Sequence, residues 1–270
     1  MERSSHPEEV AITAYFERLD ASTFRASPLV AGAWSVQEQH VAPPMGLLAH
    51  ELVRDRDARG RSDLVVGRLS YDILGTLPLE PVTTRVEVLR PGRTVELVEA
   101  VLSHAGRPAL RLRAWLQRPG DTTAVAGSPL PPVPGPDELE RWDPSSVWPG
   151  AFIGSVEVRR AQVAPGRAVS WLRTAVPLVE GEEVGALAAT AGLLDVANGM
   201  TVRAAPGDVA FPNLDLTAHL LREPTGGWVG FDTSVTFGAA GVGVTSSVLH
   251  DVRGLLGTLA QGLTVRPRRT

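Results

Sequence analysis

The 270-residue sequence predicts an α+β fold in which two antiparallel sheets are each wrapped round a central helix. Three observations predict it. Each half of the chain has one stretch with helical periodicity, the other apolar runs alternate with a period of two, and short turns join those runs as hairpins. A single helix covers a long sheet only if it packs centrally on one face, so each half becomes a curved sheet around its helix.

In the first half, a short N-terminal segment (10–20) and one or two strands (22–34) precede the helix. The helix is predicted from Pro44 to about Arg56, because proline is well tolerated in a first helical turn and the apolar residues that follow form one broad face. Four strand-like runs come next, separated by turns that carry Pro or Gly: Leu64–Ile73, Thr83–Leu89, Thr94–Leu102 and Ala109–Leu116.

Prolines and glycines make residues 119–150 a stiff extended linker, which separates a first domain (1–118) from a second (151–270). In the second domain a helix is predicted from about Val184 to Asn198, where Asn198-Gly199 marks its end. The predicted strands of this domain are Phe152–Arg160, Ala168–Thr174, Leu214–Leu221, Trp228–Phe237, Gly243–Leu249 and Leu256–Val265.

The two halves also repeat each other. A shift of 146 places residues 46–116 on residues 192–262 with 12 identities in 71 positions, roughly double the chance level for this composition. Three positions become polar only in the second copy. They are Ala49, Gly67 and Trp115 in the first copy and Asp195, Asn213 and Gln261 in the second. This difference predicts one working site in the second half beside a degenerate one in the first.

Composition excludes several function classes. A net charge of −4 argues against nucleic acid and anionic membrane as main partners, and no apolar run is long enough for a membrane helix. The chain has no Lys and no Cys, so Schiff-base lysine and cysteine-nucleophile chemistry are excluded. The six histidines show no zinc-motif spacing, so we expect no metal and no cofactor. The polar N-terminus, Met1–Glu9, and the lack of Cys favour the cytoplasm.

Three segments carry a family resemblance: Gly192–Asn198 (GLLDVAN), Pro212–His219 (PNLDLTAH) and Gly257–Gly262 (GTLAQG). In order and spacing they resemble the acyl-CoA thioesterase II family of double-hotdog proteins, along roughly residues 12–267. The resemblance implies a double hotdog that hydrolyses acyl-CoA to free acid and CoA. It also implies that the family's catalytic acid, hydroxyl and amide correspond to Asp195, Asn213 and Gln261.

The chain departs from this family in two places. Asn213 stands where the family usually has Thr or Ser, and an Asn side chain still donates and accepts hydrogen bonds. The Gly-Gly-Gln stretch expected before the first helix reads Gln39-His40-Val41-Ala42, which changes the acyl entrance. His40, just before that helix, is a candidate substrate-binding residue at the acyl or CoA entrance.

These residues fit thioester hydrolysis. Asp195 can act as a general base on water or as a direct nucleophile, and Asn213 and Gln261 can hold that water from either side. Backbone N–H groups at a helix start can stabilise the developing oxyanion. The bland alternatives are a capping carboxylate at Asp195, a strand-end role for Asn213 and a wet-face position for Gln261. Asp215 is interpreted as a structural acid that holds a loop through backbone amides.

The sequence leaves a second function open, a non-catalytic hotdog that binds acyl or CoA ligands, because both departures affect the site. A hotdog dehydratase ranks behind both, since its Gly-Asp-x-Asn-Pro-x-x-His string is absent. Exposed sheet edges of such folds are commonly covered by another copy, so a homodimer or higher homo-oligomer is expected.

Overall fold

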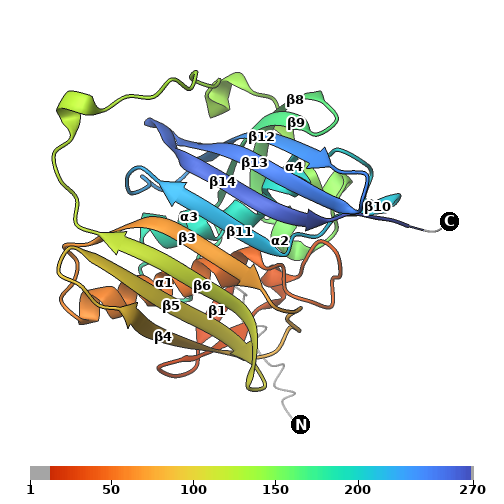
Figure 1. The fold of residues 1–270 in the computed structure, drawn as a ribbon. Helices are drawn as coiled ribbons and strands as arrows, with labels where there is room; N and C mark the ends of the chain where they lie inside the picture. The colour runs from red at the N-terminus through yellow and green to blue at the C-terminus, as the bar shows by residue number, and fades with distance from the viewer. Residues whose placement is uncertain (1–12, 269–270) are drawn as a thin grey trace, which may run out of the picture.

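The computed structural model describes residues 13–268, so Met1–Glu9 and the start of the predicted N-terminal segment lie outside the described residues. One antiparallel sheet of thirteen strands dominates this part of the chain, in the order β1-β2-β4-β5-β6-β3-β11-β14-β13-β12-β9-β8-β7. Figure 1 shows the broad sheet with the helices behind it. The α+β class with a large antiparallel sheet is therefore confirmed.

The first half contributes β1 (Phe16–Arg18), β2 (Thr23–Ala26), β3 (Val65–Ile73), β4 (Val82–Arg90), β5 (Val95–His104) and β6 (Arg107–Gln117). The second half contributes β7 (Arg141–Trp142), β8 (Val156–Ala164), β9 (Arg167–Thr174), β11 (Asp215–Leu220), β12 (Val229–Phe237), β13 (Val242–Asp251) and β14 (Gly254–Thr264). A separate two-stranded sheet pairs β10 (Val209–Ala210) with β15 (Arg266–Pro267).

The sequence predicts two sheets, whereas the structure has one continuous sheet. Strand β3 of the first half pairs antiparallel with β11 of the second, with Ser70 opposite Thr217. The hydroxyls of these two residues are hydrogen-bonded at 2.9 Å. Two curved sheets become one because pairing these strands satisfies backbone groups that would otherwise be left at two open edges.

The helices are α1 (Ala42–Ala58), α2 (Ala151–Gly154), α3 (Ala186–Ala191) and α4 (Ala197–Met200), with 3₁₀ turns η1 (Pro28–Val30), η2 (Thr123–Val125), η3 (Pro136–Glu138), η4 (Pro144–Ser146) and η5 (Leu194–Val196). Helix α1 agrees with the predicted helix. Pro43 and Pro44 lie in its first turn, and its buried side chains include Met45, Leu48 and Leu52. These side chains join the hydrophobic core on the inner side of the sheet.

The prediction of one continuous helix over 184–198 is wrong. The segment divides into α3, the 3₁₀ turn η5 and α4, which ends at Met200. The break follows Gly192, where α3 meets α1: an added Cβ on Gly46 would lie 3.0 Å from the Gly192 Cα. Beyond this contact the chain tightens, and Leu193 N–H bonds to Thr190 C=O. Asp195 therefore sits on a 3₁₀ turn rather than on a regular helix.

The predicted linker is also more structured at its end than its composition indicates. Arg141 and Trp142 form β7, which pairs with β8 and extends the sheet. The strand predicted over Phe152–Arg160 begins only at Val156, because residues 151–154 form the short helix α2. Phe152 N–H bonds to Ala31 C=O, so this helix is tied to the first half instead of the sheet.

The structure changes the spacing of the internal repeat. The strands β4, β5 and β6 begin at Val82, Val95 and Arg107, and β12, β13 and β14 begin at Val229, Val242 and Gly254, a shift of 147 in each case. The helices keep a shift of 146, since Gly46 lies against Gly192. One residue is therefore inserted between the helix and the strands of the second half, which an ungapped comparison cannot reveal.

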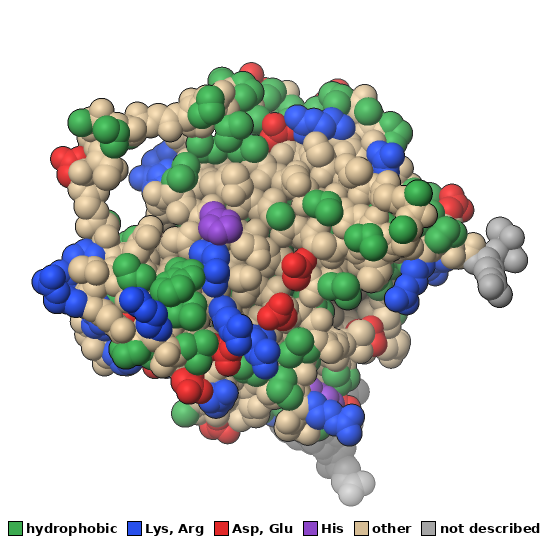
Figure 2. Space-filling model, in the orientation of Figure 1, with side chains coloured by type: hydrophobic (Ala, Val, Ile, Leu, Met, Phe, Trp, Pro, Cys, Tyr) green, Lys and Arg blue, Asp and Glu red, His purple; other side chains and the backbone are tan. Residues whose placement is uncertain are grey.

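The outer face of the sheet is the side turned away from the helices. Figure 2 shows uncharged polar side chains and backbone over most of the second half, and arginines with acidic residues over the first. In residues 13–268, no helix has the length and apolar character that crossing a membrane requires.

Candidate active site

A cavity of about 320 Å³ lies at the seam between the two halves. The loop before α1, the residues after β3, and the segments around η5 and β10 line it. Most of its wall is apolar, including Trp34, Val41, Leu77, Trp148, Ile153 and Met200. Its polar lining includes Glu38, Gln39, His40, Asp195, Asn198 and Asn213. The shape suits an apolar group that ends beside a small polar centre.

Asp195 is the acid of this centre. It comes from η5, and only 5% of the residue is exposed. Burial raises the pKa of its carboxyl to about 6, against a smaller opposing effect of a hydrogen bond from Asn213. An acid with a pKa near 6 is largely ionised at neutral pH and accepts a proton more readily than an ordinary aspartate.

Asn213 reaches Asp195 from the chain just before β11. Its Nδ2 donates a 2.7 Å hydrogen bond to Asp195 Oδ1 and a second, of 3.2 Å, to the Asp215 backbone carbonyl. The second bond fixes the direction of the amide. Asp195 Oδ1 is therefore occupied, while Oδ2 faces His40.

Gln261 reaches the same turn from β14, but at a different atom. Its Nε2 donates a 3.1 Å hydrogen bond to the backbone carbonyl of Asp195 rather than to its carboxylate. Gln261 is buried and does not line the cavity. Its Oε1 is an enclosed acceptor without a protein partner among residues 13–268. The structure thus brings all three predicted residues together, with Gln261 holding the main chain of the turn.

His40 lies on the opposite wall, immediately before α1. Its Nδ1 accepts a 3.1 Å hydrogen bond from the Ala42 N–H and is 3.8 Å from Asp195 Oδ2. Burial lowers the pKa of His40 to about 3, so the ring is neutral at physiological pH. Because a neutral Nδ1 that accepts a hydrogen bond carries no proton, the proton is on Nε2. The predicted entrance residue therefore lies beside the acid itself.

Sequence analysis missed the aromatic wall of the cavity. The rings of Trp34, Trp148 and Phe211 form a cluster, with centroids 4.9 to 5.7 Å apart in edge-to-face contacts. Trp148 belongs to the predicted linker, and its indole N–H bonds to the Gly199 carbonyl at 2.8 Å. A tryptophan in a proline-rich stretch, where a solvated linker has no need of a large ring, is the signal that could have indicated it.

The repeat-related position in the first half has no comparable centre. With the shifts of the structure, Asp195, Asn213 and Gln261 correspond to Ala49, Val66 and Ala114, all buried and apolar. The bridge Asn213–Leu263 matches the pair Val66–Leu116 in the first half. Gly67 and Trp115 were the wrong counterparts, since a one-residue shift along a strand moves a side chain to the other face.

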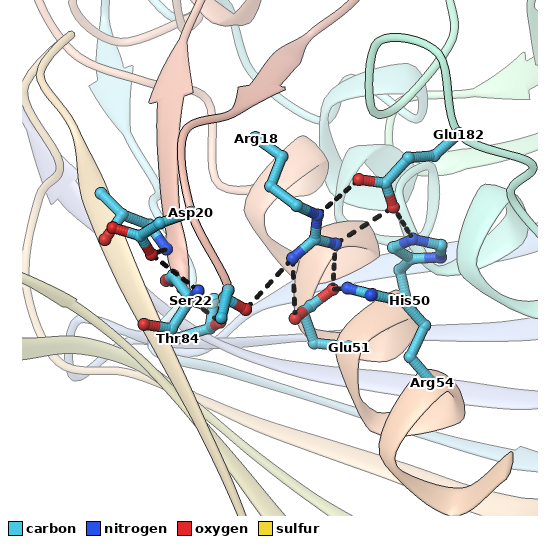
Figure 3. A network of polar contacts seen from close by, with 10 residues as sticks. Arg18, Asp20, Ser22, His50, Glu51, Arg54, Thr84 and Glu182 are labelled. Atoms are coloured by element: carbon cyan, nitrogen blue, oxygen red, sulfur yellow. Dashed lines mark hydrogen bonds and ion pairs between the residues drawn. The ribbon is translucent and has the colours of Figure 1, made fainter. Parts of the chain in front are cut away.

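A network of charged residues lies beside Ala49. Figure 3 shows Arg18 between Glu51 of α1 and Glu182 of the loop before α3, with His50 on the other side of Glu182. Arg18 donates to Glu182 at 2.5 Å and to Glu51 at 2.6 Å, and His50 Nε2 is 2.9 Å from Glu182. The network therefore joins the two halves by ion pairs where the second half has its cavity.

Two further sequence expectations concern single residues. Asp215 accepts a 2.6 Å hydrogen bond from the Gly262 N–H, which confirms its interpretation as a structural acid. Within residues 13–268, no three His, Asp or Glu side chains gather in a way that would hold a metal ion.

Comparison with known proteins assigns the chain to a family. Residues 127–265 match the acyl-CoA thioesterase C-terminal domain, and residues 30–117 match the acyl-CoA thioesterase N-terminal domain. The chain belongs to the acyl-CoA thioesterase family. Its activity is the hydrolysis of acyl-CoA thioesters, which places it among enzymes rather than non-catalytic ligand-binding proteins. No curated protein matches it significantly.

Solved structures agree with this thioesterase in fold. An acyl-CoA thioesterase II, TesB2, from Mycobacterium marinum has a TM-score of 0.66 at 17% identity, covering 94% of this chain and 96% of its own. A protein assigned as a thioesterase from Novosphingobium aromaticivorans has a TM-score of 0.69 at 24% identity, covering 93% and 98%. A hotdog-fold protein of unknown function from Alicyclobacillus acidocaldarius has a TM-score of 0.70 at 14% identity, covering 96% and 97%.

Proposed function

We propose that Asp195 is the general base of this thioesterase and that the acyl group of the substrate occupies the cavity beside it. One observation carries the proposal. A buried carboxylate with a raised pKa ends an apolar cavity, with one oxygen held by Asn213 and the other free of any such donor. This arrangement leaves Asp195 Oδ2 to accept a proton from a water molecule.

In the reaction, the oxygen of that water attacks the thioester carbonyl carbon, and its proton moves to Asp195 Oδ2. The carbonyl electron pair moves to the oxygen and gives a tetrahedral oxyanion. When the intermediate collapses, the C–S bond breaks and Asp195 returns the proton to the departing thiolate of CoA. The products are the free acid and CoA, and the enzyme is unchanged.

Asn213 and Gln261 have different roles in this mechanism. Asn213 orients the carboxylate through Oδ1, and its own side-chain oxygen can accept a hydrogen bond from the attacking water. Gln261 is a positioning residue, because it holds the Asp195 backbone. Its enclosed Oε1 offers a second acceptor to the water from the other side. The Asn in place of Thr or Ser is thus compatible with hydrolysis.

The cavity supports a limit on the acyl group. Its volume of about 320 Å³ equals roughly ten water molecules at about 30 Å³ each. The aromatic wall of Trp34 and Trp148 further favours acyl groups of medium length or with a ring. We expect kcat/KM to rise and then fall along a series from butanoyl-CoA to palmitoyl-CoA, with the fall beginning once the chain exceeds the cavity.

Release of CoA thiol tests the mechanism cleanly, because the protein contains no cysteine and gives no thiol background. Asp195→Asn keeps the size of the side chain and an oxygen that accepts from Asn213, yet removes the base. We expect kcat to fall about 10²–10⁴-fold. Asp72→Asn, an exposed acid of β3 that does not line the cavity, is the matched control. Unchanged turnover in Asp195→Asn would contradict the proposal.

A direct nucleophilic attack by Asp195 is the competing route, and an isotope separates the two. In a single turnover in H₂¹⁸O with enzyme in excess, general-base catalysis puts ¹⁸O directly into the acid product. A nucleophilic Asp195 would instead give unlabelled acid in the first turnover, with the label retained in the aspartate. We expect labelled product.

Three broader properties complete the proposal. The exposed residues 118–130 support a linker within 119–150 between the domains 1–118 and 151–270, each a hotdog, and limited proteolysis should cut there. A homodimer would use the outer sheet face, since the edge strands β1 and β7 have only three and two residues. Light scattering after gel filtration tests this. A cytoplasmic location fits the cysteine-free chain and is tested by fractionation.

A further inference from the structure

The start of helix α1 faces Asp195 across the cavity, and it is the natural place for an oxyanion to bind, since the first N–H groups of a helix are free. In this chain the first turn offers almost none. Pro43 and Pro44 have no N–H, and the Ala42 N–H is already donated to His40 Nδ1. The next N–H, that of Met45, bonds to the Val41 carbonyl within the helix.

His40 supplies a donor at the same place. Its Nδ1 is occupied by the Ala42 N–H, which fixes the proton on Nε2. Among residues 13–268, Nε2 has no hydrogen-bond partner and is not one of the fully enclosed polar atoms that lack one. Because His40 lines the cavity, this N–H is open to a molecule bound there. Phe152 packs against the ring at a centroid distance of 4.6 Å and limits its rotation.

The distances fit a reacting thioester. His40 Nδ1 is 3.8 Å from Asp195 Oδ2. Since the two nitrogens of an imidazole ring are about 2.2 Å apart, Nε2 lies within roughly 6 Å of that oxygen. A water bonded to Oδ2 and a carbonyl oxygen about 2.9 Å from Nε2 would place the reacting atoms about 3–3.5 Å apart.

We propose that the Nε2–H of His40 is an oxyanion donor of this thioesterase and replaces the backbone donors that Pro43 and Pro44 remove from the start of α1. The inference rests on the proposed function, because it needs Asp195 to activate water. His40 donates a hydrogen bond without transferring its proton. As the carbonyl electron pair moves to oxygen, the bond shortens and stabilises the charge, and it relaxes when the C–S bond breaks.

Neutrality suits His40 to this role. A protonated imidazole beside Asp195 would form an ion pair with the base and make it a weaker proton acceptor. The low pKa of His40, caused by burial, keeps the ring neutral across the pH range in which Asp195 is ionised. The Val41 N–H, for which no partner is found among residues 13–268, is a backbone group that can act beside it.

Two substitutions separate the two ring nitrogens. Asn in place of His40 can accept from the Ala42 N–H as Nδ1 does, but has no group at the position of Nε2. Gln places its amide N–H near the position of Nε2 and cannot cap Ala42 in the same way. His40→Asn therefore tests the donor, and His40→Gln tests the cap. His104→Asn and His104→Gln, at a histidine paired with Glu80 and away from the cavity, are the matched controls.

We expect His40→Asn to keep the Tm within a few degrees of the wild-type value and to lower kcat about 10²–10³-fold, with KM changed less than about threefold. We expect His40→Gln to lower the Tm but to retain kcat within about tenfold of wild type. The His104 variants should match wild type in both. Circular dichroism at the assay temperature shows whether each variant is folded.

Wild-type kcat in His40→Asn would overturn the proposal, as would an equal loss of kcat in both His40 variants while both are folded. Either result leaves the role of Asp195 standing if Asp195→Asn is inactive. By contrast, wild-type protein that hydrolyses no acyl-CoA from butanoyl to palmitoyl would overturn the proposed function itself, so the two failures are distinguishable.

Discussion

Asn213 donates a 2.7 Å hydrogen bond to Asp195 Oδ1, although Asp195 lies on a 3₁₀ turn and Asn213 precedes a strand eighteen residues later. This bond makes the two carboxylate oxygens unequal. Oδ1 is held by an amide, and Oδ2 is left toward His40 and the cavity. The base therefore has a defined direction before any substrate binds, which is the preorganisation that catalysis needs.

The pKa of Asp195 predicts the pH dependence of hydrolysis. Burial raises that pKa to about 6, and the base acts only when it is ionised. We expect kcat/KM to be flat above about pH 7 and to fall tenfold per pH unit well below pH 6. Initial rates of thiol release from pH 4.5 to 8.5 check this. A profile that stays flat down to pH 5 would show that another group accepts the proton.

Asn213→Ala is expected to move this profile. The hydrogen bond from Asn213 favours the charged form of Asp195 and lowers its pKa, so removing it raises the pKa further. The inflection of kcat/KM should shift to higher pH, and kcat should also fall because the carboxylate is no longer oriented. The same rate measurements give both effects. Asn198→Ala, a buried amide that also lines the cavity, serves as a comparison in which the inflection stays in place.

Asp195→Asn is expected to stabilise the protein as it inactivates it. The folded pKa of about 6 lies above the unfolded value of 3.8, so the unfolded state binds fewer protons between these values and the buried charge costs free energy at higher pH. The variant should gain about 1–3 kcal/mol in the free energy of unfolding above pH 6. The gain should vanish below pH 3.8, where both states are protonated. Urea unfolding at pH 7.5 and pH 4 compares the two.

The contact between α1 and α3 predicts an asymmetric pair of variants. A Cβ on Gly46 would lie 3.0 Å from both the Ala188 carbonyl oxygen and the Gly192 Cα, which are backbone atoms that cannot move aside. Gly46→Ala should cost about 1–3 kcal/mol of stability. A Cβ on Gly192 meets nothing closer than 3.5 Å, so Gly192→Ala should be neutral or slightly stabilising. Thermal unfolding of both variants decides, and equal Tm values would contradict the close contact.

The ion-pair network beside Ala49 predicts a link between the halves that depends on pH. The hydrogen bond from Arg18 lowers the pKa of Glu182 to about 2, with a further contribution from His50. A lowered carboxyl pKa adds stability above the unfolded value of 4.5, and that stability is lost as the pH falls toward 2. Glu182→Gln should therefore cost about 1–3 kcal/mol at pH 7 and less at pH 3. Glu180→Gln, an exposed acid of the same loop, is the control.

Local patterns were enough to predict most elements. The strand over Val82–Arg90 and the helix over Ala42–Ala58 follow from apolar periodicity and turn residues, and both were found within two residues of their predicted ends. The failures lie where distant segments meet. The second helix breaks at Gly192 because α1 crosses it there, and Trp148 leaves the linker to close the cavity. Neither contact has a signal within its own stretch of sequence.

The sequence by itself determined the fold class, the internal repeat, the family and the three polar residues of the second half. It could do so because each depends on residue type, period and order along the chain. Only the tertiary structure decided that the two sheets are one, that Gln261 reaches the Asp195 backbone, and that Val66 and Ala114 are the true counterparts in the first half. A strand exchanges its two faces with every residue, so a single insertion changes which side chains meet, and only the paired strands reveal it.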